Sequence, residues 1–249
     1  MLSLTPPAAR TAESGLFISL EGGDGGGKTT QMPRVHEFLS GPESPFVGFS
    51  SGADGSRPGG APTGPPVLRT KEPGGSALGA ELRSLILHSD HVADRAEALM
   101  YAADRAHHVE TVIRPHLDAG GIVLTDRYLD SSVAYQGAGR TLPVEDVESL
   151  SMWAVGGLMP NLTLLLDIAP QKLAERRDVG THDRLEREAL DFHERVRSAY
   201  LERAAKEPDR WAVIDAGAGI DEVTEQLRDA ITGWARTHAA VVAEKLGQL

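Results

Sequence analysis

Short apolar runs alternate along this chain with longer stretches in which apolar residues recur at helical spacing. The short runs are typical of buried strands, and the longer stretches are typical of amphipathic helices. The predicted strands cover residues 16–20, 67–70, 121–126, 162–168 and 211–215. The predicted helices cover residues 31–39, 78–87, 94–119, 144–154, 192–205 and a final stretch from 221 onward. This alternation predicts an α/β fold in which helices cover both faces of a five-stranded parallel sheet.

The long helix that begins at Asp94 has two further predicted features. Asp94 and Glu97 have the spacing of a capping box, so we expect them to cap its first turn. Its apolar face is predicted to consist of Leu99, Ala103 and Ala106. Pro115 lacks a backbone N–H, so it should kink or divide this helix before Gly120 and Gly121 close it.

Three segments fall outside the alternating pattern. Residues 1–15 are poor in large apolar side chains and are predicted to form a disordered leader. Residues 41–66 are rich in Gly, Pro and Ser, which favours a flexible insertion between a helix and the next strand. We therefore expect one domain over residues 16–233, followed by a helical extension over 234–249.

The formal net charge is −11, with no run of basic residues. Such a chain is a poor partner for long nucleic acids or anionic membranes, so a phosphate-bearing partner should be a small molecule. No apolar stretch has the length of about 18 residues that a membrane span needs. Cysteine is absent, which excludes disulfides and thiol nucleophiles and fits a cytoplasmic location. We expect the paired His107 and His108 on a helix surface rather than at a metal site.

A phosphate-binding motif lies between the first predicted strand and the first predicted helix. It reads Gly22-Gly23-Asp24-Gly25-Gly26-Gly27-Lys28-Thr29, followed by Thr30, and matches the P-loop pattern G-x-x-x-x-G-K-[ST]. Glycines let successive backbone N–H groups turn toward phosphates, and the following helix adds its positive dipole end. Lys28 should reach the β- and γ-phosphates of ATP, and the Thr29 hydroxyl should bind Mg²⁺.

A P-loop also needs an acid at the end of a nearby strand to orient the metal. Asp126 and Asp167 both follow apolar runs. Asp126 is favoured because Arg127 follows it and supplies a cation for the transferred phosphate. Asp167 is expected to be a solvated strand end or a helix cap.

Several segments beyond the P-loop narrow the function. In order along the chain they are EGGDGGGKTT, TKEPGGSALGAELRSLIL, EALMYAADRAHHV, DRYLDSSVAYQGAGR, PNLTLLLD and DRLEREALDFHERV. Together they resemble the bacterial thymidylate kinase family over most of residues 16–215. The resemblance implies a P-loop NTPase fold with a mobile lid, a homodimer, and the reaction ATP + dTMP → ADP + dTDP with Mg²⁺.

The resemblance also implies which residues hold the phosphates and the sugar. Asp24 should accept a hydrogen bond from the sugar 3′-OH, and Arg127 should bridge the donor and acceptor phosphates. Lys71 stands where the family has Arg on the acceptor phosphate, which replaces a bidentate fork by a point charge. Glu72 should be a companion acid near the metal or that phosphate. The alternative for Lys71 and Glu72 is a solvated surface pair.

A second set of residues is implied to recognise the base. Tyr101 should stack on thymine, Arg105 should donate to a base oxygen, and Arg83 should lie near the base. The residues expected to read the base edge and exclude a 2′-hydroxyl are Ser132, Tyr135 and Gln136. Tyr101 and Arg105 could instead form an ordinary i,i+4 contact on a helix surface, and Tyr135 could be a core aromatic.

The segment Arg176–Arg184 resembles the family's lid. Members with glycine at the position of Gly25 tend to supply a catalytic arginine from this lid. The available arginines are Arg176, Arg177, Arg184 and Arg187, of which Arg184 is the catalytic candidate.

Two other classes of P-loop protein remain to be weighed. A GTPase needs an Asn-Lys-x-Asp segment, but the only asparagine, Asn161, is followed by Leu162. A kinase for another nucleotide stays open, because thymine and uracil differ by one methyl group, worth about 1–3 kcal/mol.

Overall fold

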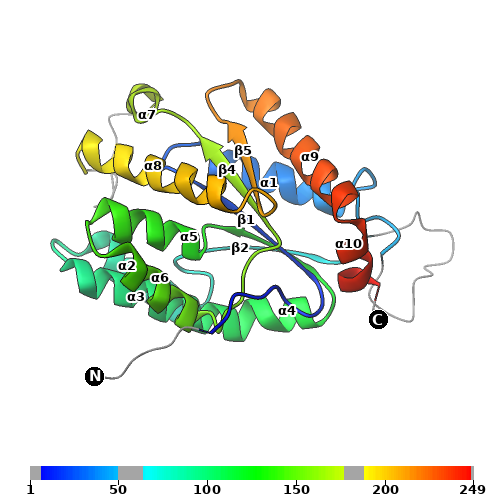
Figure 1. Ribbon diagram of the computed structural model, residues 1–249, viewed down its shortest axis with the longest axis horizontal. Coiled ribbons are helices and arrows are strands. Elements are labelled where there is room, and N and C mark those ends of the chain that lie inside the picture. Colours follow the sequence, from blue (N-terminus) through cyan, green and yellow to red (C-terminus); the bar gives the residue numbers. More distant parts are fainter. Residues whose placement is uncertain (1–6, 50–63, 177–187, 248–249) are drawn as a thin grey trace.

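The computed structural model describes residues 7–49, 64–176 and 188–247, arranged as Figure 1 shows. Five parallel strands form one sheet in the order β2-β3-β1-β4-β5. The strands are β1 (Leu16–Gly22), β2 (Val67–Lys71), β3 (Ile122–Asp126), β4 (Leu162–Asp167) and β5 (Trp211–Asp215). The predicted five-stranded parallel sheet is therefore confirmed. In such a sheet, ligands bind beyond the carboxyl ends of the strands, where the strand order reverses.

Helices connect all of these strands. The α-helices are α1 (Lys28–Ser40), α2 (Ala77–His88), α3 (Asp94–His108), α4 (Arg114–Asp118), α5 (Leu129–Ser132), α6 (Val144–Ala154), α7 (Pro170–Arg176), α8 (Leu190–Lys206), α9 (Ile220–Thr237) and α10 (Ala239–Leu246). Two π-helical segments, η1 (Val109–Ile113) and η2 (Val133–Gly139), continue α3 and α5. Every predicted helix is present, whereas α5 and η2, which carry cleft residues, were not predicted.

Alternate residues of β1 face opposite layers of helices. Leu16, Ile18 and Leu20 join the core under α1, α9 and α10, which lie together on one side of the sheet in Figure 1. Phe17 belongs to the core on the other face, beneath α4, α5 and η1. Because strand side chains alternate with a period of two, Glu21 lies on the same face as Phe17.

The first turn of α3 differs from the prediction. The N-cap is Ala93, with no side-chain cap, so the capping-box prediction is wrong. Glu97 is instead buried and accepts a hydrogen bond from Gln136 Nε2 at 2.8 Å. The predicted apolar face is also wrong, because Leu99 is 57% exposed while Ala98 and Tyr101 are buried. Packing against α2, α6 and η2 selects this other face of the helix.

The same long helix changes its hydrogen-bond pattern where Pro115 was expected to divide it. The α-helical pattern of α3 gives way to the π-helical η1, and α4 resumes with Pro115 in its first turn. A wider turn before proline accommodates both the missing N–H and the bulk of the ring. The predicted division is therefore confirmed as a change of helix type.

The described part of the N-terminal segment packs on the domain. Arg10 N donates to Gly157 O, and Arg10 O accepts from Met159 N, both at 2.8 Å. Ala12 is buried in the core. The prediction of a disordered leader is wrong for residues 7–15, and residues 1–6 lie outside the described part of the chain.

The insertion and the C-terminal extension also contribute to the core. Phe46, within the predicted flexible insertion, is fully buried in the same cluster as α1, so that prediction is wrong for residues 41–49. Residues 50–63 lie outside the description. In the C-terminal segment, α9 runs through the predicted boundary at 233 and α10 follows it, and Trp234 and Leu246 belong to the same core.

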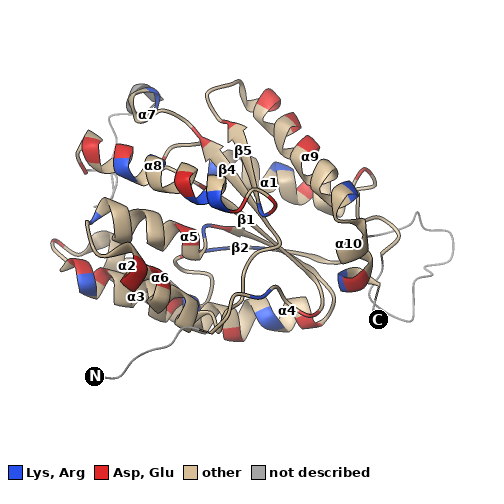
Figure 2. Cartoon of the chain, viewed as in Figure 1, with Lys and Arg blue, Asp and Glu red and all other residues tan. Residues whose placement is uncertain are grey.

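Charged residues of both signs are interspersed along the helices, as Figure 2 shows, and α9 carries several acids. Among the described residues, none of the helices combines the length and the apolar character needed to cross a membrane.

Candidate active site

A cleft of about 980 Å³ opens beyond the carboxyl ends of β1, β2 and β3. Its walls come from the P-loop, the β2–α2 loop, α3 and the α5–η2 helix. The predicted site residues that line it are Asp24, Gly25, Gly27, Lys28, Thr29, Thr30, Lys71, Glu72, Arg83, Tyr101, Arg105, Asp126, Arg127, Ser132, Tyr135 and Gln136. Gly22, Gly23 and Gly26 build the loop behind this surface, and Arg184 lies outside the described residues.

The P-loop has the backbone that a phosphate cradle requires. Gly25 and Gly27 have φ values of 81° and 96°, a region that side chains with a Cβ rarely adopt. The position of a Cβ on Gly27 meets nothing within 4 Å, so the loop is open at this point. Phosphate oxygens can therefore approach the backbone N–H groups closely.

Lys28 is held against the loop that it would serve. Its buried Nζ donates to Gly22 O and Gly23 O, both at 2.9 Å. Burial and the nearby charge of Arg127 lower the pKa of Lys28 from 10.5 to about 8. A phosphate would offer this ammonium group stronger, charged acceptors than the two carbonyl oxygens.

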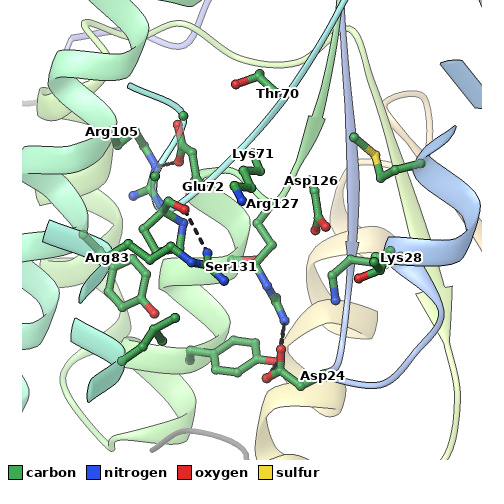
Figure 3. Close-up of a pocket in the computed structure, with 18 of the residues that line it drawn as sticks. Asp24, Lys28, Thr70, Lys71, Glu72, Arg83, Arg105, Asp126, Arg127 and Ser131 are labelled. Atoms are coloured by element: carbon green, nitrogen blue, oxygen red, sulfur yellow. Dashed lines mark hydrogen bonds and ion pairs between the residues drawn. The ribbon is translucent and has the colours of Figure 1, made fainter. Parts of the chain in front are cut away.

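The two strand-end acids have different surroundings. Asp126 lines the cleft together with Thr29 and lies beside Lys28 in Figure 3. Asp167 instead binds Arg197 through two hydrogen bonds of 2.7 and 2.8 Å. This geometry favours Asp126 as the metal partner and makes Asp167 an ion-pair residue rather than a solvated strand end. Oxygen donors such as Thr29 and Asp126 fit the ligand preference of Mg²⁺.

Arg127 occupies the middle of the cleft and has a left-handed backbone, with φ of 70°. Its guanidinium donates to Asp24, to Ser131 Oγ at 3.0 Å and to Tyr135 OH at 3.0 Å. Figure 3 shows this side chain running toward Asp24, between Lys28 on one side and Arg105 on the other. Burial would raise the pKa of Asp24, but the charges of Arg127 and Lys28 hold it below 3.8.

Glu72 is buried, which rules out the surface-pair alternative for this residue. Its carboxylate accepts from Arg105 Nε at 2.7 Å and contacts His108 Nδ1 at 3.0 Å. His108 is also fully buried, so its predicted surface position is wrong. Lys71, by contrast, is exposed at the end of β2. Glu72 therefore supports Arg105. Arg105 is itself buried, which excludes the alternative of an i,i+4 contact on a helix surface.

Two buried polar groups at the cleft have no hydrogen-bond partner among the described residues. They are Arg105 Nη1 and Ser132 Oγ. Leaving a buried donor unpaired costs about 1–3 kcal/mol, which a bound molecule with matching oxygens would recover. Arg83 is engaged instead, because its Nη1 donates to Pro73 O at 2.9 Å and so supports the β2–α2 loop.

The unpredicted α5–η2 helix brings three base-reading candidates to one wall. Tyr135 is both a core residue and a cleft residue, since it packs in the core while its hydroxyl donates to Asp24 Oδ2 at 2.7 Å. The amide nitrogen of Gln136, rather than its oxygen, faces Glu97, because a carboxylate only accepts hydrogen bonds. π-Helical turns are frequent at functional sites.

Sequence reasoning missed three residues that surround Arg127. Ser131 lies next to a predicted residue in DRYLDSS, and Glu21 directly precedes the P-loop, so both could have been found by proximity to motifs. Tyr200 OH lies 3.3 Å from Arg127 Nη1 although the two residues are 73 positions apart. No local pattern around Tyr200 marks this contact.

Comparisons with known proteins agree with this site. The family model described as thymidylate kinase matches residues 62–227. The chain is 48% identical to a thymidylate kinase from Clavibacter sepedonicus, over 92% of this chain and 98% of that protein. It is 48% identical to one from Leifsonia xyli subsp. xyli, over 90% and 97%, and 46% identical to one from Thermosynechococcus vestitus, over 93% and 90%. The chain therefore belongs to the thymidylate kinase family.

Proposed function

We propose that this protein is a dTMP kinase, which transfers the γ-phosphoryl group of ATP to dTMP and forms ADP and dTDP. The observation that carries the proposal is one cleft that joins a complete P-loop to a wall with unpaired buried donors at Arg105 and Ser132. A P-loop ATPase needs only the P-loop and has no need of a second wall that binds an acceptor. Family membership supports dTMP as the acceptor.

Phosphoryl transfer requires the two phosphates to be aligned and their charge to be neutralised. In the proposed reaction, the P-loop amides and Lys28 bind the β- and γ-phosphates of ATP. Arg127, midway across the cleft, contacts the transferred group and the acceptor phosphate. An acceptor oxygen then attacks the γ-phosphorus, the bond to the bridging β–γ oxygen breaks, and ADP leaves.

Mg²⁺ would be held by Thr29 and Asp126, and it supplies neutralisation of charge on the phosphate oxygens. Asp24 has a second task in this proposal. It holds Arg127 in the free protein, and it accepts a hydrogen bond from the 3′-OH of dTMP when the sugar is bound.

The acceptor base is proposed to lie between Tyr101 and the η2 wall. The orphaned Nη1 of Arg105 suits one acceptor oxygen of dTMP. Gln136, with its nitrogen on Glu97, is oriented to offer its carbonyl oxygen to the base edge. Lys71 is proposed as a point charge near the acceptor phosphate.

Three parts of the proposal rest on the resemblance. These are a catalytic arginine from the lid, with Arg184 as candidate, a cytoplasmic location and a homodimer. For the homodimer the structure adds one argument. The neighbouring helices α2, α3 and α6 expose Leu85, Leu99 and Trp153, which are apolar side chains that a second copy would cover.

The first test is an acceptor panel. ADP release from ATP·Mg²⁺ is measured with dTMP, dUMP, dCMP, dGMP, UMP or no acceptor. We expect strong turnover with dTMP and little with UMP. A preference for another monophosphate would contradict the base-reading assignments, and acceptor-independent ADP release would show an ATPase.

Ser132→Ala separates substrate binding from folding. Its hydroxyl is buried without a partner among the described residues, so its removal should leave the melting temperature unchanged or slightly higher. If the hydroxyl bonds to dTMP, KM for dTMP should rise by about 2–10-fold, the worth of one neutral hydrogen bond. Ser198→Ala, on the exposed surface of α8, is the control. An unchanged KM would remove Ser132 from the acceptor site.

A further inference from the structure

Glu21 is a buried carboxylate that the proposed reaction does not use. It lies near the end of β1, is fully buried, and is not among the residues that line the cleft. Its carboxylate accepts three hydrogen bonds. Oε1 accepts from Tyr128 N at 2.8 Å, and Oε2 accepts from Ser131 Oγ at 2.6 Å and from Tyr200 OH at 2.9 Å.

Two of these donors also contact the Arg127 guanidinium, and the third is the backbone amide that follows Arg127. Arg127 Nη1 donates to Ser131 Oγ at 3.0 Å and to Tyr200 OH at 3.3 Å. Tyr128 N is the first amide after Arg127, whose φ of 70° is unfavourable for a residue with a side chain. Glu21 thus contacts both the backbone that follows Arg127 and the hydroxyls beneath its guanidinium.

The direction of the hydroxyl protons connects Glu21 to Arg127. Each hydroxyl has a single proton to donate, and a carboxylate can only accept. Ser131 Oγ and Tyr200 OH also hydrogen-bond to each other at 2.7 Å, so the two hydroxyl protons serve three contacts. While Glu21 Oε2 accepts, neither proton points toward Arg127, and both oxygens keep a lone pair that accepts from the guanidinium. Without the carboxylate, one proton stays between the two hydroxyls, and the other can turn toward the guanidinium, which is itself a donor.

We propose that Glu21 is a positioning residue for phosphoryl transfer. Its carboxylate orients Ser131, Tyr200 and the backbone after Arg127, and so holds the guanidinium at the place where it meets the phosphates. This inference rests on the proposed function, because it assigns Glu21 to the same reaction through Arg127.

The charge state of Glu21 is sensitive to its surroundings. Burial, followed by the charge of Asp130 on α5, raises the pKa of Glu21 from 4.5 to about 7. The hydrogen bond from Ser131, the charge of Arg127 after β3 and the hydrogen bond from Tyr200 on α8 act in the opposite direction. The charge of Lys28 on α1 also interacts with that of Glu21. The carboxylate is therefore lost as pH falls through about 7, and with it the arrangement of the hydroxyls.

The test compares kcat and KM across pH 5.5–9 for the wild type and Glu21→Gln. An amide nitrogen in place of Oε2 donates to the hydroxyls, so one hydroxyl proton is left to turn toward Arg127. We expect kcat of Glu21→Gln to fall by about 10–100-fold, the effect of a small misplacement of a catalytic group. KM for ATP and dTMP should change only a few-fold. Glu194→Gln, an exposed acid on α8, is the control.

The pH profile adds a readout that a purely structural role would not change. The wild-type kcat should decline below about pH 7, and this decline should be weaker in Glu21→Gln. Phosphate groups of the substrates titrate in both proteins, so they cancel from the comparison. Equal profiles for the two proteins would overturn the proposal.

A double-mutant cycle tests whether Glu21 acts through Arg127. In an Arg127→Ala background, Glu21→Gln should cause no further loss of kcat. A full independent loss there would overturn the proposal. Tyr200→Phe serves as a second variant in case Glu21→Gln folds poorly, because it keeps the ring that packs against Trp211 and removes only the hydroxyl. It should lower kcat in the same direction.

A crystal structure of Glu21→Gln separates this inference from the proposed function. The expected result is an Arg127 guanidinium that no longer contacts Ser131 Oγ and Tyr200 OH, whatever the acceptor proves to be. An unmoved Arg127 would overturn the inference. Failure of the wild type to phosphorylate dTMP, with Arg127 displaced in the variant, would overturn the proposed function alone.

Discussion

Arg127→Ala should lower kcat for dTMP phosphorylation by at least about 10²-fold, since arginines that stabilise transferring phosphoryl groups contribute about 10³–10⁵. The guanidinium lies in the middle of the cleft, between Lys28 and Arg105, and its partner Asp24 also faces the cleft. Its removal leaves developing negative charge on the phosphate oxygens without a cation. Steady-state ADP release at saturating ATP and dTMP measures this loss.

The matched control is Arg34→Ala, because Arg34 forms an exposed ion pair with Asp221 on the α1–α9 side of the molecule. This control should keep wild-type turnover. Melting curves of both variants separate catalysis from folding. Turnover of folded Arg127→Ala near the wild-type rate would show that another cation, such as one from the lid, neutralises the phosphates.

Asp130→Ala should destabilise the folded protein by about 3–5 kcal/mol, the cost of breaking a buried ion pair. Asp130 is fully buried and binds Arg203 Nε at 2.7 Å and Arg210 Nη1 at 2.8 Å. Burial would raise its pKa, but Arg210 and Arg203 lower it, so the group is an anion at neutral pH. Alanine leaves the mostly buried guanidinium groups of Arg203 and Arg210 with only Glu148 and Glu207 as acidic partners, and both of these carboxylates are about half exposed.

Urea unfolding monitored by circular dichroism measures this loss of stability. The control is Asp221→Ala, which breaks an ion pair with an exposed carboxylate and should have a much smaller effect. A similar small effect for Asp130→Ala would mean that Glu148 and Glu207 compensate both arginines. The ion-pair network between α5, α8 and the α8–β5 loop would then be a minor contributor to the fold.

Much of the architecture is encoded in local patterns. Apolar runs such as Ile122–Asp126 and Leu162–Asp167 are long enough to identify buried strands, because each residue of such a run meets a helix layer on one face or the other. The spacing of glycines before Lys28 identifies the phosphate cradle, because the loop needs backbone conformations that residues with a Cβ rarely adopt. These features depend only on near neighbours along the chain.

The helix predictions show where such patterns fail. Leu99 was placed on the buried face of α3, yet it is exposed, and the buried face carries Glu97, Arg105 and His108. The α5–η2 helix was missed because its sequence, LDSSVAYQGAG, contains glycines and lacks a clear apolar period. Polar residues that serve a cleft disturb the periodicity on which the prediction relies.

The strand-helix alternation, the P-loop and most of the residues that line the cleft can be identified from the chain alone. Which polar residues are buried together depends on the three-dimensional packing, as it does for Glu72 with His108 and Glu21 with Tyr200. Burying a charged group is favourable only when partners satisfy it. Those partners come from elements far apart in the chain, so no local sequence pattern predicts them. Glu21 and Tyr200 are separated by 179 positions and meet only because α8 packs against η2 and β5.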